Sequence, residues 1–181
     1  MLRGLQDMIS NASPLIFFGR LNKLDLLIKL FSRIEIIGSV YEEVVDEGAK
    51  GGKFEVEIIK EFIGKKLIVV EKLSSKFKEQ SDFVKKSFRI ERGESDTIAF
   101  VLQKKTKQVI IDEKPVRRAA EFFGILPIGT LGVILLAYKK NMINENEVDD
   151  IVEKLISDNF RIGSDVLNEF WKLLDEIKKK K

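Results

Sequence analysis

Polar and acidic side chains stand at four points of the sequence where a short apolar run gives way to a helical pattern. They are Ser10, Asn11 and Ser13, then Glu42 and Glu43, then Glu94 and Asp96, and finally Asp112 and Glu113. Carboxylates gathered at one edge of a fold repel one another, and burying them without a partner is costly. A divalent cation relieves both effects. Because the chain has no His and no Cys, an all-oxygen Mg²⁺ or Mn²⁺ site is the chemistry that these residues support.

Each of these groups also has a purely structural explanation. Glu94 and Asp96 fall in a first helical turn, where the helix dipole favours acidic residues. Glu42 and Glu43 fit a solvated helix face, and the segment 112–114 fits an ordinary turn. Taken one at a time, the groups are better explained in this way. Their recurrence at four separate connections is what favours a shared site.

The composition excludes several classes of protein. The chain has 181 residues, of which 44% are apolar and 34% charged, and this suits one soluble domain with a buried core. The absence of Cys and His excludes disulfides, thiolate nucleophiles, Cys/His zinc sites and Ser-His-Asp triads. Asp7 and Asn11 interrupt any signal-peptide core, and the apolar stretch 124–138 is shorter than the ~20 residues of a membrane helix. We therefore expect a cytoplasmic protein with no membrane partner.

Strand-like and helix-like segments alternate along the chain. Strands are expected at 6–10, 34–37, 67–70, 109–111 and 126–128. Helical patterns begin near 14, 24 and 39 and cover 54–63, 94–103, 116–123, 130–140, 145–157 and 164–178. Ser39 fits a cap for the helix after the second strand. The alternation predicts an α/β fold, a three-layer α/β/α sandwich with a mainly parallel sheet of four or five strands, plus C-terminal helices. The polar groups above then meet at the carboxyl ends of the strands.

We expect a core domain over 1–140 and a helical extension over 141–181 packed on the same domain. A charged insertion at about 71–92 is the least regular part of the core domain. In it, Lys85, Lys86 and Arg89 stand among phenylalanines at 77, 83 and 88. Basic groups contact phosphates and exposed rings stack on bases, so the insertion is a candidate nucleic-acid interface. The simpler interpretation, which the amphipathic pattern favours, is a surface helix with Phe on its buried face and Lys in water.

Four short motifs follow one another in order along the chain. They are Ile9-Ser10-Asn11-Ala12-Ser13-Pro14-Leu15-Ile16, Val40-Tyr41-Glu42-Glu43-Val44, Gly93-Glu94-Ser95-Asp96-Thr97-Ile98-Ala99 and Ile110-Ile111-Asp112-Glu113-Lys114. A longer run, Ile128-Gly129-Thr130-Leu131-Gly132-Val133-Ile134-Leu135, comes after them. The ordered set resembles the PIN domain, the nuclease fold of toxin ribonucleases and of many RNA-processing enzymes. The longer run is similar to an uncharacterised prokaryotic branch of that superfamily.

The resemblance implies a metal site and identifies its acids. The cation, Mg²⁺ or Mn²⁺, would be bound by Glu43, Asp96 and either Asp112 or Glu113. Glu113 is the stricter match at the fourth motif, and Asp112 competes with it. The family has Asp at the first position, where this chain has Asn11. Asn keeps one acceptor oxygen but loses the charge, and metal affinity depends on the charge of the ligands.

Three functions follow from the resemblance. The first is a divalent-metal-dependent ribonuclease acting on single-stranded RNA, with catalytic residues Asn11, Glu43, Asp96 and Glu113. The groups expected to contact RNA are Ser13, which would also orient the acids, Lys85, Lys86 and Arg89. The second function is an inactive PIN-like module that binds RNA or protein, because the first Asp is lost. The third is the toxin of a toxin–antitoxin pair, covered by an antitoxin-like protein. By analogy, the resemblance also implies a homodimer.

Overall fold

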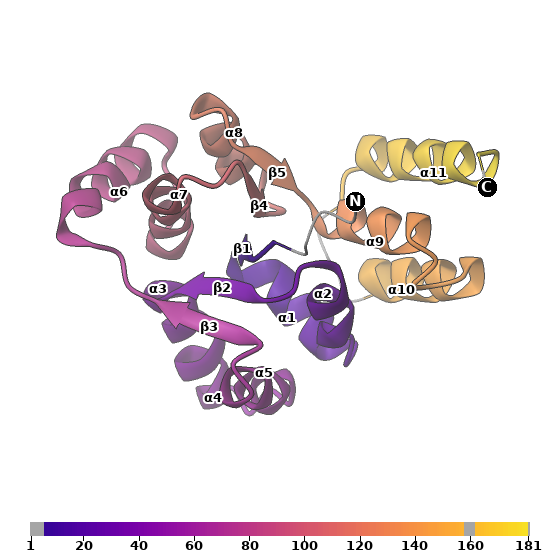
Figure 1. The fold of residues 1–181 in the computed structure, drawn as a ribbon, viewed down its shortest axis with the longest axis horizontal. Coiled ribbons are helices and arrows are strands. Elements are labelled where there is room, and N and C mark those ends of the chain that lie inside the picture. The colour runs from indigo at the N-terminus through magenta and orange to yellow at the C-terminus, as the bar shows by residue number, and fades with distance from the viewer. Residues whose placement is uncertain (1–5, 158–161, 181) are drawn as a thin grey trace. The chain divides into compact units, whose positions relative to one another are not determined.

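Five short strands form one parallel sheet in the computed structural model, which describes residues 6–157 and 162–180 (Figure 1). They are β1 (Met8–Ser10), β2 (Ile34–Ile37), β3 (Ile68–Glu71), β4 (Gln108–Ile110) and β5 (Leu126–Ile128). Their order across the sheet is β3-β2-β1-β4-β5, and each neighbouring pair runs parallel. β1 and β2 are buried along their whole length, as expected for a parallel sheet covered on both faces.

The strand order places the ends of β1 and β4 side by side. The chain runs from β1 outward through β2 to β3, and then returns to β4 and β5 on the other side of β1. Ser10 pairs with Ile110 in the β1–β4 register, so Asn11 and Ile111 leave the sheet next to each other. Ligand sites of open parallel sheets lie where the strand order reverses in this way, beyond the carboxyl ends of the strands.

Helices cover both faces of this sheet, within a compact unit that comprises Met1–Gly129. They are α1 (Ala12–Arg20), α2 (Leu24–Leu30), α3 (Gly38–Tyr41), α4 (Gly48–Lys50), α5 (Glu55–Gly64), α6 (Ser75–Phe88), α7 (Arg92–Lys104) and α8 (Lys114–Phe122). α1 packs against α5, whereas α7 packs against α8 and against β1 and β2. The predicted three-layer α/β/α sandwich is confirmed.

The helix after β2 begins without an intervening turn. α3 continues into a π-helical turn, η1 (Glu42–Glu47), and then into α4. Ile37, the last residue of β2, occupies the N-cap position, so the prediction that Ser39 caps this helix is wrong. The wide π-helical turn allows the adjacent residues Val44 and Val45 both to be buried. Such turns recur at functional sites, and this one carries Glu43.

The charged insertion forms a regular helix, contrary to the expectation of low regularity. α6 occupies its centre and ends at Phe88, and the C-cap residue Arg89 has a φ of 53°. Ser81 and Val84 are its buried residues, and α6 lies side by side with α7 (Figure 1). Helical spacing explains this packing, because a residue three positions after Ser81 returns to the same face. Phe83 is 52% exposed, so the phenylalanines do not all lie on the buried face.

A second compact unit comprises Thr130–Lys181. Its helices are α9 (Thr130–Lys139), α10 (Glu145–Ser157) and α11 (Ser164–Lys178), and α9 packs against both of the others. α10 buries Val148, Ile151 and Leu155 at helical spacing. The predicted extension over 141–181 falls in this unit, and α9 belongs to the same unit. Residues 158–161 and 181 of the extension are outside the described residues. No helix in the described ranges is long and apolar enough to cross a membrane.

Candidate active site

Asn11 and Glu113 connect the ends of β1 and β4. The backbone N–H of Asn11 continues the sheet by donating to the carbonyl of Ile110 at 3.0 Å. The buried Asn11 side chain then donates from Nδ2 to Glu113 Oε2 at 3.4 Å. Ser13, in the first turn of α1, donates from Oγ to Glu113 Oε1. The two donors hold the Glu113 carboxylate at the reversal of the strand order.

The local sequence around Glu113 leaves its carboxylate available for these contacts. Glu113 occupies the N-cap of α8, but its side chain makes no capping hydrogen bond. Pro115 stands in the first turn of the helix, where a missing N–H needs no partner. The carboxylate therefore bonds across the sheet edge to Asn11 and Ser13 rather than to its own helix.

Thr97 holds the other side of the Asn11 amide. Its Oγ1 donates to the carbonyl of Gly93 at 2.7 Å and lies 3.5 Å from Asn11 Oδ1. Both Thr97 and Asn11 are buried. Sequence reasoning did not select Thr97 as a site residue. Thr97 follows Glu94 by three residues and Gly93 by four, so all three lie on the same side of the helix. This spacing could have identified Thr97 as a site residue.

Glu43 approaches the first turn of α7. A Cβ added to Gly93 would lie 3.0 Å from Glu43 Oε2, so a residue without a side chain allows this close approach. Burial, followed by the nearby charges of Glu113 and Glu94, raises the pKa of Glu43 to about 7. Glu43, Glu94 and Glu113 therefore form a carboxylate cluster whose members repel one another.

Glu94 joins this cluster through the start of α7. Its Oε2 accepts a hydrogen bond from the backbone N–H of Glu91 at 2.7 Å, as part of a capping box. Burial raises the pKa of Glu94 against the effect of that hydrogen bond, and the charge of Glu113 raises it further. Capping alone explains why an acid suits position 94. The electrostatic interaction between Glu94 and Glu113 is a separate effect that capping does not explain.

Asp96 makes its contacts elsewhere, although it stands only two residues after Glu94. Its Oδ1 accepts a hydrogen bond from Ser81 Oγ at 2.6 Å, and its Oδ2 lies 3.5 Å from Arg92 Nε. Two residues apart on an α-helix point in nearly opposite directions, because each residue turns by about 100°. The structure thus brings Glu94 to the other two glutamates and leaves the expected acid, Asp96, against α6.

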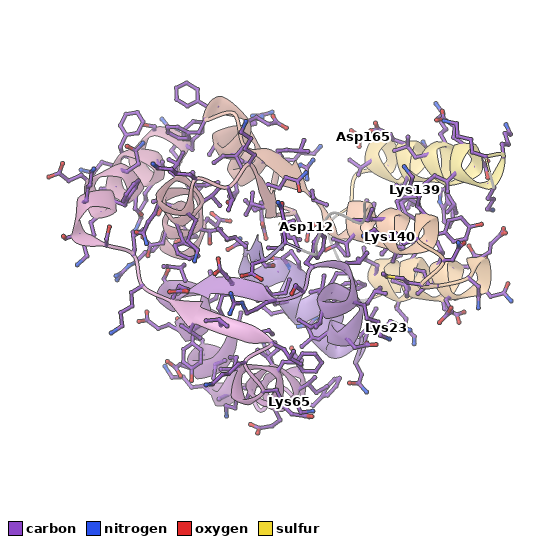
Figure 2. The ribbon with its side chains drawn as sticks, in the orientation of Figure 1. Lys23, Lys65, Asp112, Lys139, Lys140 and Asp165 are labelled. Carbon is purple, nitrogen blue, oxygen red and sulfur yellow. The ribbon has the colours of Figure 1, made fainter. Side chains whose placement is uncertain are left out.

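Asp112 and Glu113 also differ in their surroundings. Asp112, which follows β4 (Figure 2), has its Oδ1 3.2 Å from where a Cβ on Gly129 would lie. Arg117 Nη1 is 3.3 Å from the same point and donates to the carbonyl of Ile111 at 3.1 Å. Of the two acids, Glu113 is the one hydrogen-bonded to Asn11 and Ser13.

A family model for the PIN domain matches residues 7–176, which include all of these residues. The chain belongs to the PIN-domain family. The match confirms the resemblance drawn from the four motifs and indicates a nuclease-type fold. PIN domains generally use divalent metal ions. None of the curated proteins matches the chain.

The donors of this PIN domain suit a hard cation. The cluster offers carboxylate oxygens from three elements and one amide, the donor types that Mg²⁺ and Mn²⁺ prefer. Among residues 6–157 and 162–180, no three acidic side chains are close enough as they stand to hold a metal ion together. Mg²⁺ commonly binds through one or two carboxylates and keeps several waters, so a direct ligand from every acid is not required.

The basic residues predicted to contact RNA lie on and just after α6. Lys85 and Lys86 are exposed in its last turn, and Arg89 is exposed immediately after it. Phe88 and Phe122 stack edge to face beside them, with ring centroids 5.6 Å apart. Contact with RNA at these residues stays a prediction.

Proposed function

We propose that this PIN domain is a divalent-metal-dependent ribonuclease that cuts single-stranded RNA. The observation that carries the proposal is the carboxylate cluster at the reversal of the strand order. Burial, followed by the like charges of the cluster, raises the pKa of both Glu43 and Glu94. Unfavourable charge of this kind is relieved when a cation binds.

The surrounding residues have separate roles in this proposal. Glu43, Glu94 and Glu113 bind the cation, directly or through its waters. Ser13 and Asn11 orient Glu113 through the hydrogen bonds that they donate to it. Thr97 limits the orientation of the Asn11 amide because its hydroxyl lies beside Oδ1.

Hydrolysis adds water to the phosphorus and breaks the bond to the leaving oxygen. A bound divalent cation supplies charge stabilisation for the scissile phosphate and lowers the pKa of the attacking water. A cluster carboxylate accepts the proton that the water loses, and solvent protonates the leaving oxygen. Single-stranded RNA is the favoured substrate because its phosphates and bases are accessible without opening a duplex.

Cleavage of an unstructured, end-labelled RNA by the full-length protein tests the proposal. Activity should require Mg²⁺ or Mn²⁺ and disappear in EDTA, and Glu43→Gln should abolish it. Glu121→Gln is the matched control, because Glu121 is an exposed acid of α8 outside the cluster. Cleavage that persists in EDTA, in protein free of contaminating nuclease, contradicts the metal mechanism.

The inactive PIN-like module is favoured by one observation. The site accommodates an amide at position 11, with Nδ2 facing a carboxylate and Oδ1 facing a hydroxyl. RNA binding without cleavage in any divalent cation would support this alternative. The antitoxin-like partner and the homodimer are proposals that follow from the family alone.

A further inference from the structure

A cavity of about 510 Å³ lies within the first unit, between the end of β2, α6 and the start of α7. This volume falls in the range of small-molecule binding sites. Charged residues from two helices line it, among them Lys78 and Lys85 of α6 and Arg92 and Asp96 of α7. The carboxylate cluster proposed above uses none of these four residues.

One wall of the cavity carries fixed hydrogen-bonding groups. The Asp96 side chain is only 13% exposed and is held by Ser81 and Arg92. Ser39 also lines the cavity, and its Oγ is shielded from water without a hydrogen-bond partner among the described residues. A buried polar atom of this kind is completed in native proteins by an ordered water or an ion.

Gly38 opens the same wall. A Cβ added to Gly38 would meet no atom within 4 Å, and its φ is not positive. Neither backbone conformation nor packing within the protein therefore requires glycine at this position. Because Gly38 lines the cavity, the space beside its Cα is available to a ligand that approaches the backbone closely.

Lysines line the cavity beside Asp96, together with the acids Asp82 of α6 and Glu71 of β3. Lys78 and Lys85 are two helical turns apart and line the cavity from one face of α6. Both are exposed, and neither forms an ion pair within the described part of the chain. Lys72, just after β3, also lines the cavity. The lysines suit an anion, and Asp96 suits a group that donates hydrogen bonds.

The cavity and the carboxylate cluster are neighbours. The position of a Cβ on Gly93 lies 3.0 Å from Glu43 Oε2 in the cluster and 3.9 Å from the carbonyl oxygen of Ser39 in the cavity wall. Glu42, next to Glu43 in η1, also lines the cavity. A nucleic-acid strand whose phosphate lies at the cluster therefore has its adjacent nucleotide within reach of the cavity.

We propose that this cavity binds the nucleotide adjacent to the scissile phosphate of single-stranded RNA. Lys78 and Lys85 contact its phosphate, and Asp96 accepts a hydrogen bond from its ribose hydroxyl or base. The inference rests on the RNA-binding part of the proposed function. It assigns Asp96 to substrate recognition, on the opposite side of α7 from Glu94.

Binding of an end-labelled RNA in EDTA, measured by fluorescence anisotropy, tests the two lysines without any cleavage. Lys78→Ala with Lys85→Ala should raise the Kd at least tenfold. It should also reduce the slope of log K against log salt by about 0.7, the contribution of one single-strand phosphate contact. The matched control is Lys53→Ala with Lys76→Ala, which removes two exposed lysines that do not line the cavity. Equal weakening by the two pairs overturns the proposal.

Gly38→Ala tests the wall that contains Gly38 and Asp96 without a change of charge. It should raise the Kd about tenfold, because its methyl group fills the space beside the backbone. Gly64→Ala is the matched control, since a Cβ there also meets no atom within 4 Å and its φ is not positive. Thermal melts confirm that each variant is folded. Wild-type affinity in Gly38→Ala overturns the proposal.

The two proposals fail in different ways. Cavity-dependent RNA binding without cleavage in Mg²⁺ or Mn²⁺ refutes the nuclease and leaves the nucleotide site standing. Metal-dependent cleavage with no difference between the two lysine pairs refutes the nucleotide site alone. Absence of RNA binding in the wild-type protein refutes the nucleotide site.

Discussion

The carboxylate cluster and the neighbouring cavity meet at the first turn of α7, yet the acids in the two regions have different surroundings. Glu94 faces Glu113, and burial and like charge raise its pKa. Asp96, two residues later, forms an ion pair with Arg92 and accepts a hydrogen bond from Ser81. One helical turn thus supplies an uncompensated acid to one region and a compensated acid to the other.

This difference separates metal binding from recognition. Uncompensated carboxylates have unfavourable mutual charge that a divalent cation relieves, so the cluster suits catalysis that requires a metal. A carboxylate already held by a guanidinium and a hydroxyl gains less from a cation. It is instead a rigid acceptor, which suits the selection of a ligand that donates hydrogen bonds.

The largest expected effect is the contrast between Glu94→Gln and Asp96→Asn. Glu94→Gln should slow single-turnover RNA cleavage at least a hundredfold, which corresponds to a loss of about 2.8 kcal/mol of transition-state stabilisation. Gln keeps the capping box, so the helix start should persist. Asp96→Asn should slow cleavage by no more than about tenfold, mainly through weaker RNA binding. The motif match alone places Asp96 among the catalytic acids, and a larger loss in Asp96→Asn than in Glu94→Gln would contradict the division into two regions.

The affinity for Mn²⁺ should depend on pH because of Glu43. The pKa of Glu43 is raised to about 7, so a cation must displace a proton from it at lower pH. Affinity measured by calorimetry should fall about tenfold per pH unit below 7, as expected for one displaced proton.

In EDTA, the folding stability should depend on pH in the opposite direction. Stability should decline as pH rises from about 4.5 through 7, because the folded state loses a proton that it binds more tightly than the unfolded state does. Glu43→Gln should flatten both profiles, and unchanged profiles would contradict this assignment.

Asn11→Asp should tighten Mn²⁺ binding and accelerate RNA cleavage by about tenfold or more. A nearby unit charge contributes roughly a few kcal/mol at an effective dielectric near 20, and each ~1.4 kcal/mol is a tenfold change. In EDTA the same variant should be less stable by about 1 kcal/mol, because Glu113 loses the donor that Nδ2 supplies. Opposite shifts of the melting temperature with and without Mn²⁺ are the measurement. A variant that binds metal no better would show that position 11 does not face the cation.

The smallest expected effects compare two serines of the cavity. Ser81→Ala should reduce the free energy of unfolding by about 2 kcal/mol, because Ser81 Oγ donates to a largely buried carboxylate. Ser39→Ala should change stability by less than about 0.5 kcal/mol, since its hydroxyl has no partner in the described residues. Urea unfolding of the two variants gives both values. A large loss in Ser39→Ala would indicate that its hydroxyl already has a structural partner, such as a buried water.

The bounds of several strands and helices could be predicted from the local sequence pattern. The strand at Ile34–Ile37 and the helices Glu145–Ser157 and Ser164–Lys178 have the bounds that the apolar spacing indicated. The start of α3 could not be predicted, because the choice between a cap at Ser39 and one at Ile37 depends on how β2 enters the helix. The regularity of α6 was also missed, since its many charges concealed a narrow packed face at Ser81 and Val84.

Residue types and spacing were enough to specify a parallel sheet and four polar or acidic connections at its carboxyl edge. These follow from composition and from periodicity, which are local properties of the chain. Packing between distant segments determined which acid of each pair enters the cluster. The approach of Gly93 to η1 and the docking of α6 on α7 place Glu94 with Glu43 and Asp96 with Ser81. The hydrogen bonds from Asn11 and Ser13 select Glu113 at the last connection. Adjacent acids look alike in sequence, and only the direction of each side chain in the folded protein distinguishes them.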